Sequence, residues 1–458
     1  MIPLSLKKIA NITNGKLYGK SLIIHNVIID SKKITPGSLF IALQGKKFDA
    51  HNFIEEVLHK GCSAIITQKK IAFKTNYIIV ENTTIALGKI ANWLRKKINP
   101  QILSITGSCG KTSVKEMTKS ILKKYKNTIS TFDNLNNHIG VPITLIRLEE
   151  KHKYGIIELG GSNPGEIHYT SNIAQPNIVL INNIYYSHLE GFKSLLGVSK
   201  AKSEILSGLQ SQGTVIINLD SHHISQWKKK IKNKKVVYFS IEKKKESHFF
   251  SKNIKIYTDK TCFTMYTPSG KVNISLPCLG YQNISNALAA TALAYSINIP
   301  LKEIQNGLSK TPTLSGRLES IKLSPNKILI NDTYNSNVAS MIAAIKILEK
   351  MPGYKILVVA DMAELGKNSI LYHRMIGNIA NISKIDIIFS IGENSHEITK
   401  MSENGVHFLD KIKLNKKLKK IILKKETITV LIKGSRSTKM EKTVTYLIRE
   451  CKKNDNID

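Results

Sequence analysis

The sequence has few cysteines and no long apolar stretch. Its 458 residues include five cysteines, at positions 62, 109, 262, 278 and 451, and their spacing matches neither a disulfide framework nor a zinc site. No uninterrupted apolar run approaches the ~18–20 residues that a bilayer span needs. The first residues lack the apolar core and cleavage site of a signal peptide. We therefore expect a cytoplasmic protein that makes no stable membrane insertion.

Arginine is scarce in a chain that is otherwise strongly basic. Lysine and arginine number 68 against 33 acidic residues, a formal net charge of +35, yet only six of these bases are arginines. Specific nucleic-acid contacts use arginine and aromatic side chains, whereas these lysines lie in short runs without interleaved aromatics. Ile and Asn are abundant as well, so an AT-rich coding sequence explains the charge. We predict no nucleic-acid partner. A basic nucleic-acid-binding ATPase, with steeply salt-dependent binding, is the alternative from another class.

Length and apolar patterning predict three α/β domains, at residues 1–83, 84–312 and 313–458. A chain of this length holds about three domains of ~150 residues. Mean hydropathy of −0.12 and 42% apolar residues are typical of a globular protein. In the first domain, short β-type runs alternate with turn residues; they lie at Leu22–Ile29, Ser38–Leu43, Ala64–Thr67 and Tyr77–Val80.

The second domain begins with a predicted helix, Thr84–Ile98, which ends before Pro100 because the residue preceding proline disfavours helical geometry. Apolar runs interleaved with helical patterns then predict a parallel sheet with helices on both faces. A β-rich stretch at 236–279 is expected to form an antiparallel edge or an inserted hairpin layer. From residue 313 the alternation restarts, which predicts a second doubly wound unit of Rossmann type, with strands at Ile328–Ile330, Ile356–Ala360, Ile387–Ile391 and Ile428–Ile432.

A glycine-rich loop lies between a buried-strand pattern and an amphipathic helix. It reads Thr106-Gly107-Ser108-Cys109-Gly110-Lys111-Thr112-Ser113. Such a loop curls so that its N–H groups and the helix N-terminus face an anion. Lys111 would reach the β- and γ-phosphates of a nucleotide, and the Thr112 hydroxyl would bind Mg²⁺. The spacing is shorter than the usual Walker pattern, because Ile105 stands where the first glycine belongs. An ordinary glycine turn that caps a helix is the alternative.

The variant loop resembles that of the ATP-dependent Mur ligase family, and further segments follow in that family's order over essentially the whole chain. These segments are Asp30-Ser31-Lys32, Phe48-Asp49-Ala50-His51, Asn134-Leu135-Asn136-Asn137, Glu158-Leu159-Gly160, His188-Leu189-Glu190, Ala201-Lys202, Asn283–Ala290, Gly316-Arg317-Leu318, Asp332–Asn337, Asp361–Gly366 and Lys433-Gly434-Ser435-Arg436-Ser437. The resemblance implies a small α/β uridine-binding domain, a central P-loop-type ATPase domain with a parallel sheet, and a C-terminal Rossmann-like domain.

The resemblance also implies substrates and cofactors. It is strongest with the branch of the family that joins D-alanyl-D-alanine to UDP-N-acetylmuramoyl-tripeptide through an acyl phosphate, in the synthesis of peptidoglycan precursors. That branch implies ATP and two Mg²⁺ ions, and we expect a monomer. A sister ligase that adds a single amino acid is the nearest alternative. The sister that adds diaminopimelate should carry Asp-Asn-Pro-Arg in its last domain, and this tetrapeptide is absent.

Roles for individual residues follow from their matching positions. Catalysis is assigned to Lys111, His188 and Lys202, and metal binding to Thr112, Glu158, His188 and Lys202. ATP binding is assigned to Gly107, Ser108, Cys109, Gly110, Lys111, Thr112, Ser113, Asn283, Asn286, Arg317 and Asp332. Substrate binding is assigned to Ser31, Asn134, Asn137, Asn335, Lys433 and Arg436. Arg317 and Asp332 would reach ATP from a closing third domain.

Lys202 is the most specific of these assignments, because the matching lysine of the family is carbamylated by CO₂. The reaction needs a neutral amine, so we expect burial or nearby positive charge to depress the pKa of Lys202. Lys200, two residues earlier, competes for the role, although the pattern Ala-Lys-x-Glu favours Lys202. Asn283 has a simpler alternative role as a helix N-cap. Departures from the family pattern include Lys32, Gln282, Asn331 and Ala360, and they bear on substrate affinity more than on reaction class.

Overall fold

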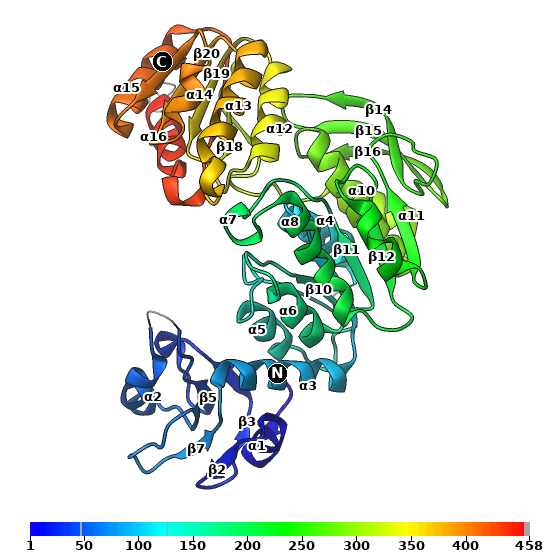
Figure 1. Ribbon diagram of the computed structural model, residues 1–458, viewed down its shortest axis with the longest axis vertical. Coiled ribbons are helices and arrows are strands. Elements are labelled where there is room, and N and C mark those ends of the chain that lie inside the picture. The colour runs from blue at the N-terminus through cyan, green and yellow to red at the C-terminus, as the bar shows by residue number, and fades with distance from the viewer. Residues whose placement is uncertain (46–47, 126, 453–458) are drawn as a thin grey trace.

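The computed structural model describes residues 1–45, 48–125 and 127–452. The chain forms three α/β units, as the sequence predicted. The N-terminal unit and the C-terminal unit lie at opposite ends of the middle unit (Figure 1).

The N-terminal unit is built on a five-stranded sheet in the order β2-β7-β6-β5-β4, in which only the β2–β7 pair is antiparallel. Its strands are β1 Leu4–Ser5, β2 Lys16–Tyr18, β3 Ile23–Ile24, β4 Asn26–Ile28, β5 Ser38–Ile41, β6 Ala64–Thr67 and β7 Asn76–Ile79, and its helices are α1 Leu6–Thr13 and α2 Ile54–His59. The prediction of one strand over Leu22–Ile29 is wrong. The run breaks at His25, because β3 pairs with β1 outside the main sheet while β4 pairs with β5 within it.

Helix α3 (Thr83–Ile98) joins the first two units. Asn82 caps its N-terminus by accepting a hydrogen bond from the backbone N–H of Ile85. The buried Arg95 ties the end of the helix to the middle unit, because its guanidinium donates to the carbonyl oxygens of Ala174 and Gln175, each at 2.8 Å. One apolar core runs continuously from the N-terminal unit, past α3, into the middle unit.

The middle unit contains a six-stranded, entirely parallel sheet in the order β13-β12-β11-β8-β10-β9. Its strands are β8 Gln101–Thr106, β9 Thr128–Ser130, β10 Tyr154–Glu158, β11 Ile178–Ile181, β12 Thr214–Asn218 and β13 Lys235–Phe239. Its helices are α4 Lys111–Ile121, α5 Gly140–Ile146, α6 Glu166–Ala174, α7 Leu189–Phe192, α8 Leu195–Ser203, α9 Lys228–Ile231, α10 Tyr281–Tyr295 and α11 Leu301–Ser309. Because all strands point the same way, their carboxyl ends meet at one edge, where ligands bind in open α/β folds.

The β-rich stretch at 236–279 is divided between two sheets. Strand β13 extends the parallel sheet, whereas β14 Phe250–Ile256, β15 Thr261–Thr267 and β16 Gly270–Leu276 form a separate antiparallel sheet. Helix α10 is rich in alanine and almost wholly buried, so it packs closely between α4, the parallel sheet and this small sheet. Of the two expected forms, the separate hairpin layer is correct for β14–β16, and an antiparallel edge is wrong for β13.

The C-terminal unit contains a six-stranded sheet in the order β17-β18-β22-β19-β20-β21, antiparallel only between β17 and β18. The strands are β17 Glu319–Ser324, β18 Lys327–Asp332, β19 Tyr354–Ala360, β20 Ile387–Ile391, β21 Gly405–Phe408 and β22 Ile428–Lys433. The helices are α12 Val338–Glu349, α13 Ser369–Ile382, α14 His396–Lys400, α15 Lys411–Lys424 and α16 Glu441–Lys452. They cover two apolar cores, one on each face of the sheet. Among the described residues, no helix is both long enough and apolar enough to cross a bilayer.

Candidate active site

The glycine-rich loop connects β8 to α4 at the carboxyl edge of the parallel sheet. Gly110 precedes the first turn of α4 with φ 78°. A Cβ atom on Gly110 would lie 2.3 Å from Oδ1 of Asn286 and 2.8 Å from Nδ2 of Asn182, so only glycine fits there. The loop therefore wraps tightly onto its neighbours and leaves the N-terminus of α4 to face the cavity, a geometry that suits a phosphate group.

Side chains that follow β11 hold the loop in place. Asn182 and Asn183 donate to the carbonyl oxygen of Cys109 at 2.9 and 3.1 Å, and Asn183 accepts from the Cys109 N–H at 2.8 Å. The Ser108 hydroxyl accepts from the backbone N–H of Tyr185 at 2.9 Å. Sequence reasoning did not select Asn182 or Asn183. Their position after a buried strand beside the loop strand was the available signal.

Thr112 and Glu158 meet beside the loop. The Thr112 hydroxyl donates to Oε2 of Glu158 at 3.0 Å, and Asn136 donates to Oε1 at 2.8 Å. Lys111 turns back and donates to the carbonyl oxygen of Gly107 at 2.7 Å. Burial lowers the pKa of Lys111, and the negative charge of Glu158 opposes this shift. The cationic Lys111 and the oxygen donors of Thr112 and Glu158 thus lie together beside the glycine-rich loop.

Lys202 lies at the end of α8 and is fully buried. Its ammonium donates to the carbonyl oxygen of Gly161 at 3.4 Å and sits 5.2 Å from the ring centroid of Phe192. Within the described chain, no carboxylate lies at ion-pair distance from it. Burial, reinforced by the positive charge of Lys111, lowers the pKa of Lys202 to about 7. The depressed pKa expected from the resemblance is therefore present.

His188 lies immediately before α7 and faces the C-terminal unit. Its Nδ1 contacts a carboxylate oxygen of Glu364 and lies 3.4 Å from the Ser162 hydroxyl. Its ring meets that of Phe192 edge to face, with centroids 6.2 Å apart. Phe192 therefore touches both His188 and Lys202. Glu364 was not predicted as a site residue, although it belongs to the quoted segment Asp361–Gly366.

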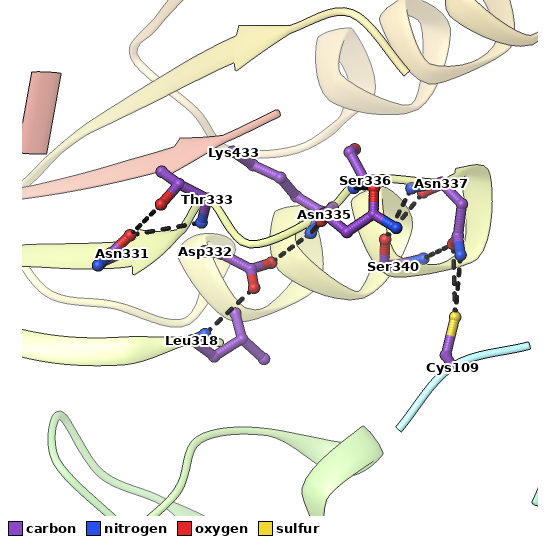
Figure 2. Close-up of polar contacts among 10 residues, drawn as sticks. All are labelled: Cys109, Leu318, Asn331, Asp332, Thr333, Asn335, Ser336, Asn337, Ser340 and Lys433. Carbon is purple, nitrogen blue, oxygen red and sulfur yellow. Dashed lines mark hydrogen bonds and ion pairs between the residues drawn. The ribbon is translucent and has the colours of Figure 1, made fainter. Parts of the chain in front are cut away.

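The C-terminal unit contributes an arginine and an asparagine to the loop. Arg317 donates to the Thr112 hydroxyl at 3.1 Å, and its guanidinium stacks 4.0 Å from the ring centroid of Tyr334. Asn337, which caps α12, donates to Sγ of Cys109 at 3.1 Å, as Figure 2 shows. Burial raises the pKa of the Cys109 thiol, so the neutral form that accepts this contact is favoured.

Asp332 and Lys433 face each other at the ends of the neighbouring strands β18 and β22 (Figure 2). The Lys433 ammonium lies 2.6 Å from Oδ2 of Asp332 and also donates to the carbonyl oxygen of Asn335 at 3.0 Å. Desolvation raises the pKa of Asp332, and Lys433 opposes that shift. The residues assigned separately to ATP and to substrate are thus partners in one buried ion pair.

These groups surround a cavity of about 700 Å³ between the middle and C-terminal units. The predicted residues that line it are Ser108, Cys109, Gly110, Lys111, Thr112, Ser113, Asn134, Glu158, His188, Asn283, Asn286, Arg317, Asp332, Asn335, Lys433 and Arg436. Four predicted residues are not among those that line it: Ser31, Gly107, Asn137 and Lys202.

Each of these four has an identifiable position. Ser31 begins the 3-10 helix Ser31–Lys33 of the N-terminal unit. The Asn137 side chain accepts from the backbone N–H groups of Ile139 and Gly140, so it shapes the start of α5. Gly107 presents its carbonyl to Lys111, and Lys202 lies buried behind Gly161. Asn283 is not the N-cap of α10. Gly280 occupies that position, and the Asn283 side chain donates to the carbonyl oxygen of Leu279.

The donor set fits a magnesium ion that binds together with a nucleotide. The described residues contain no group of three or more His, Cys, Asp or Glu side chains arranged around a common metal position. The cavity instead offers the Thr112 hydroxyl and the Glu158 carboxylate beside an anion-binding loop. Mg²⁺ in nucleotide sites uses one or two protein oxygens and completes its shell with water and phosphate oxygens.

Comparisons with known proteins agree with this geometry along the whole chain. Three profiles match: "Mur ligase family, catalytic domain" at residues 23–98, "Mur ligase middle domain" at 105–294, and "Mur ligase, glutamate ligase domain" at 316–436. The UDP-N-acetylmuramoyl-tripeptide–D-alanyl-D-alanine ligase of Buchnera aphidicola from Acyrthosiphon pisum is 68% identical, over 99% of this chain and 100% of that protein.

More distant relatives show the same coverage. The Escherichia coli K12 enzyme of the same name is 43% identical, over 98% of this chain and 99% of its own length. A crystal structure of MurF from Acinetobacter baumannii superposes with a TM-score of 0.93 at 31% identity, covering 98% of this chain and 99% of that one. From the phosphate loop, the three-unit fold and these full-length matches, it follows that this chain belongs to the Mur ligase family.

Proposed function

We propose that this chain is an ATP-dependent ligase that joins D-alanyl-D-alanine to UDP-N-acetylmuramoyl-tripeptide in the synthesis of peptidoglycan precursors. The proposal rests on full-length similarity, at 68% and 43% identity, to relatives named UDP-N-acetylmuramoyl-tripeptide–D-alanyl-D-alanine ligase. The structural observation that carries it is the phosphate loop opening into a cavity closed by Arg317 and Asn337 of the C-terminal unit. Such a cavity suits a nucleotide and an acceptor carboxylate held side by side.

The reaction that fits this cavity has two chemical steps. In the first, the terminal carboxylate of the tripeptide attacks the γ-phosphorus of ATP, which forms an acyl phosphate and releases ADP. In the second, the free amine of D-alanyl-D-alanine attacks the acyl carbon, phosphate leaves from the tetrahedral intermediate, and the amine loses its proton. Lys111 and the amides of the loop would hold the phosphates, while Arg317 neutralises charge on the transferring group.

Water must be kept from the acyl phosphate, because that intermediate hydrolyses. Contacts of Arg317 with Thr112 and of Asn337 with Cys109 bring the C-terminal unit over the loop. Such closure excludes solvent and strengthens the electrostatic contacts inside the cavity. Asp332 and Lys433 would act here as a pair, and their mutual contact fixes both side chains at the cavity wall.

Thr112, Glu158, His188 and a modified Lys202 would hold Mg²⁺. When bound, Mg²⁺ neutralises phosphate charge and holds the reacting oxygens in line. Lys202 would be carbamylated. Its neutral amine adds to CO₂ and the nitrogen loses a proton, which gives a carbamate whose oxygens can bind a metal. The complete burial of Lys202 supports this assignment, as does the absence of an ion-paired carboxylate among the described residues. Lys200, by contrast, is exposed on the opposite side of α8.

We assign residues 1–83 to the uridine-bearing part of the substrate, with Ser31 at its contact surface, residues 84–312 to ATP, and residues 313–458 to closure over both. Asn134, Asn335 and Arg436 line the shared cavity and would bind the peptide substrates. We propose that the chain acts as a monomer.

The test measures phosphate release from UDP-N-acetylmuramoyl-tripeptide, ATP and Mg²⁺ with either D-alanyl-D-alanine or single amino acids. We expect release to depend on the dipeptide. Release stimulated only by a single amino acid would reassign the chain to a sister ligase. DNA or RNA binding with a steep salt dependence, without ligation, would favour the nucleic-acid-binding alternative.

A further inference from the structure

The loop from Asp361 to Gly366 is held rigidly in the C-terminal unit. Oδ1 of Asp361 accepts hydrogen bonds from the backbone N–H groups of Asn394 and Ser395, at 3.1 and 2.7 Å. The Asp361 carbonyl accepts from the N–H of Ser435 at 3.1 Å, and the Ser435 hydroxyl accepts from the N–H of Ala363 at 2.7 Å. These hydrogen bonds attach the loop firmly to the rest of the C-terminal unit, so we expect the two to move together.

Glu364, near the end of this loop, contacts His188 in the middle unit. Its carboxylate meets Nδ1 of His188, and its carbonyl oxygen accepts from the N–H of Glu190 at 3.3 Å. The rings of Tyr186, two residues before His188, and Tyr372 of α13 also meet between the two units, with centroids 5.4 Å apart. Two segments from different units are thus matched in both main-chain and side-chain contacts.

Both partners have strained backbones. Glu364 has φ 61° and His188 has φ 51°, and neither is a glycine. Non-glycine residues in the left-handed region cost free energy, and they persist where the surroundings enforce them, often at functional sites. Two such residues in mutual contact, from segments 176 positions apart, indicate that this contact is a built feature of the closed arrangement.

We propose that Glu364 is a positioning residue: it orients the His188 imidazole from the C-terminal unit and thereby couples closure of that unit to assembly of the metal-binding side of the site. A carboxylate that accepts from Nδ1–H fixes the tautomer in which the Nε2 lone pair faces a metal. The inference rests on the proposed function, since it takes His188 as a metal ligand.

The effect extends beyond His188. Phe192 contacts the His188 ring on one side and the Lys202 ammonium on the other. Rotation of the imidazole would remove its edge-to-face contact with Phe192, the ring that also packs against Lys202. Glu364 therefore acts on both proposed metal ligands without touching the substrate.

The experiment compares Glu364→Ala and Glu364→Gln with Glu403→Ala, an exposed glutamate of the same unit that forms no ion pair among the described residues. Mn²⁺ binding is titrated calorimetrically with a non-hydrolysable ATP analogue, and closure is followed by small-angle X-ray scattering. We expect Glu364→Ala to weaken Mn²⁺ binding about tenfold, as removal of such supporting carboxylates does, and to shift scattering toward a more open shape. Glu364→Gln keeps an acceptor oxygen and should lie between, and Glu403→Ala should match wild type.

A double-mutant comparison decides whether the effect passes through His188. In a His188→Ala background, the Glu364→Ala change should have no further effect on Mn²⁺ binding. An equal loss in both backgrounds would overturn the proposal, as would wild-type binding and scattering for Glu364→Ala. Should Glu364→Ala unfold, Glu364→Gln carries the same comparison. If the wild-type enzyme ligates normally and Glu364→Ala keeps wild-type Mn²⁺ binding and scattering, this inference alone fails. If the wild-type enzyme does not ligate, the proposed function fails.

Discussion

Lys433 and Asp332 form a buried ion pair, with Nζ 2.6 Å from Oδ2, across two neighbouring strands that are about a hundred residues apart in the chain. The Lys433 side chain is 1% exposed. A buried charge that loses its partner destabilises the fold, because its lost hydration is then no longer compensated by the attraction of an opposite charge. Both side chains line the cavity, so their pairing affects stability and the site together.

Removal of one member of this pair should destabilise the C-terminal unit. We expect Lys433→Met to lower the free energy of unfolding by about 3 kcal/mol or more, since it leaves Asp332 buried and unpaired. The double variant Asp332→Asn/Lys433→Met should lose less than the sum of the two single variants. Urea unfolding measures both, with the exposed Lys442→Met as control. Additive losses would show that the two charges do not act as a pair.

Lys202→Ala should abolish ligation, and a short carboxylate such as formate should restore part of the activity by supplying the missing oxygen donor. Lys200→Ala, which changes an exposed lysine of the same helix, should remain active. Activity is measured as phosphate release at several carboxylate concentrations. Full activity in Lys202→Ala would move the metal-binding role to another residue.

Arg317→Lys should raise the KM for ATP about tenfold. Lysine keeps the charge but loses the planar stack on Tyr334 and the fork that reaches Thr112, and stacked cations contribute about 1–2 kcal/mol. Steady-state kinetics with varied ATP provide the measurement. Arg449→Lys, on an exposed part of α16, is the matched control and should leave KM unchanged. Identical KM values in both variants would mean that Arg317 does not contact the nucleotide.

The contribution of Glu397 to the free energy of unfolding should be largest above pH 4.5 and should decrease at lower pH. Ion pairs with Lys400 at 2.9 Å and Arg374 at 2.7 Å lower the pKa of Glu397 to about 2, from 4.5. A carboxylate with a depressed folded-state pKa stabilises the fold above its unfolded pKa, and that stability is lost as pH falls toward the folded pKa. The side chains are partly solvated, so the contribution should be below about 1 kcal/mol.

The comparison of Glu397→Gln with wild type tests this. At pH 7 the variant should unfold at slightly lower urea concentration, and the difference should shrink between pH 4.5 and pH 2. A difference that stays constant over this range would show that the ion pairs do not determine the stability of the contact between α13 and α14.

Local patterns were enough to predict the elements that frame the phosphate loop. The apolar run at 101–106 and the helical spacing after Lys111 became β8 and α4, because a buried strand and an amphipathic helix each have a period that is visible in sequence. The run at Leu22–Ile29 misled, since apolar spacing cannot show that β3 and β4 pair in different sheets. The strand β13 was misassigned for the same reason.

The site was predictable where chemistry is written into consecutive residues, as in the loop from Gly107 to Ser113. Only the fold shows that Lys202 is buried and Lys200 exposed. The two lysines are two positions apart on one helix, so their side chains lie about 200° apart around its axis. The sequence does not show which of these two sides faces the core. The supporting groups Asn182, Asn183 and Glu364 were not predicted. The signals available for them, a position after a buried strand and a place in a family segment, do not single out one residue, since asparagine and glutamate occur widely in loops. Their roles depend on contacts made after the sheets have formed.

By itself the sequence determined the three-unit α/β organisation, the phosphate loop and the family, because these depend on local periodicity and on short motifs in a fixed order. The tertiary structure alone decided the pairing of Asp332 with Lys433, the contact of Glu364 with His188, and the burial that depresses the pKa of Lys202. Each of these needs segments far apart in sequence to meet, and burial is a property of the packed chain that no single segment carries.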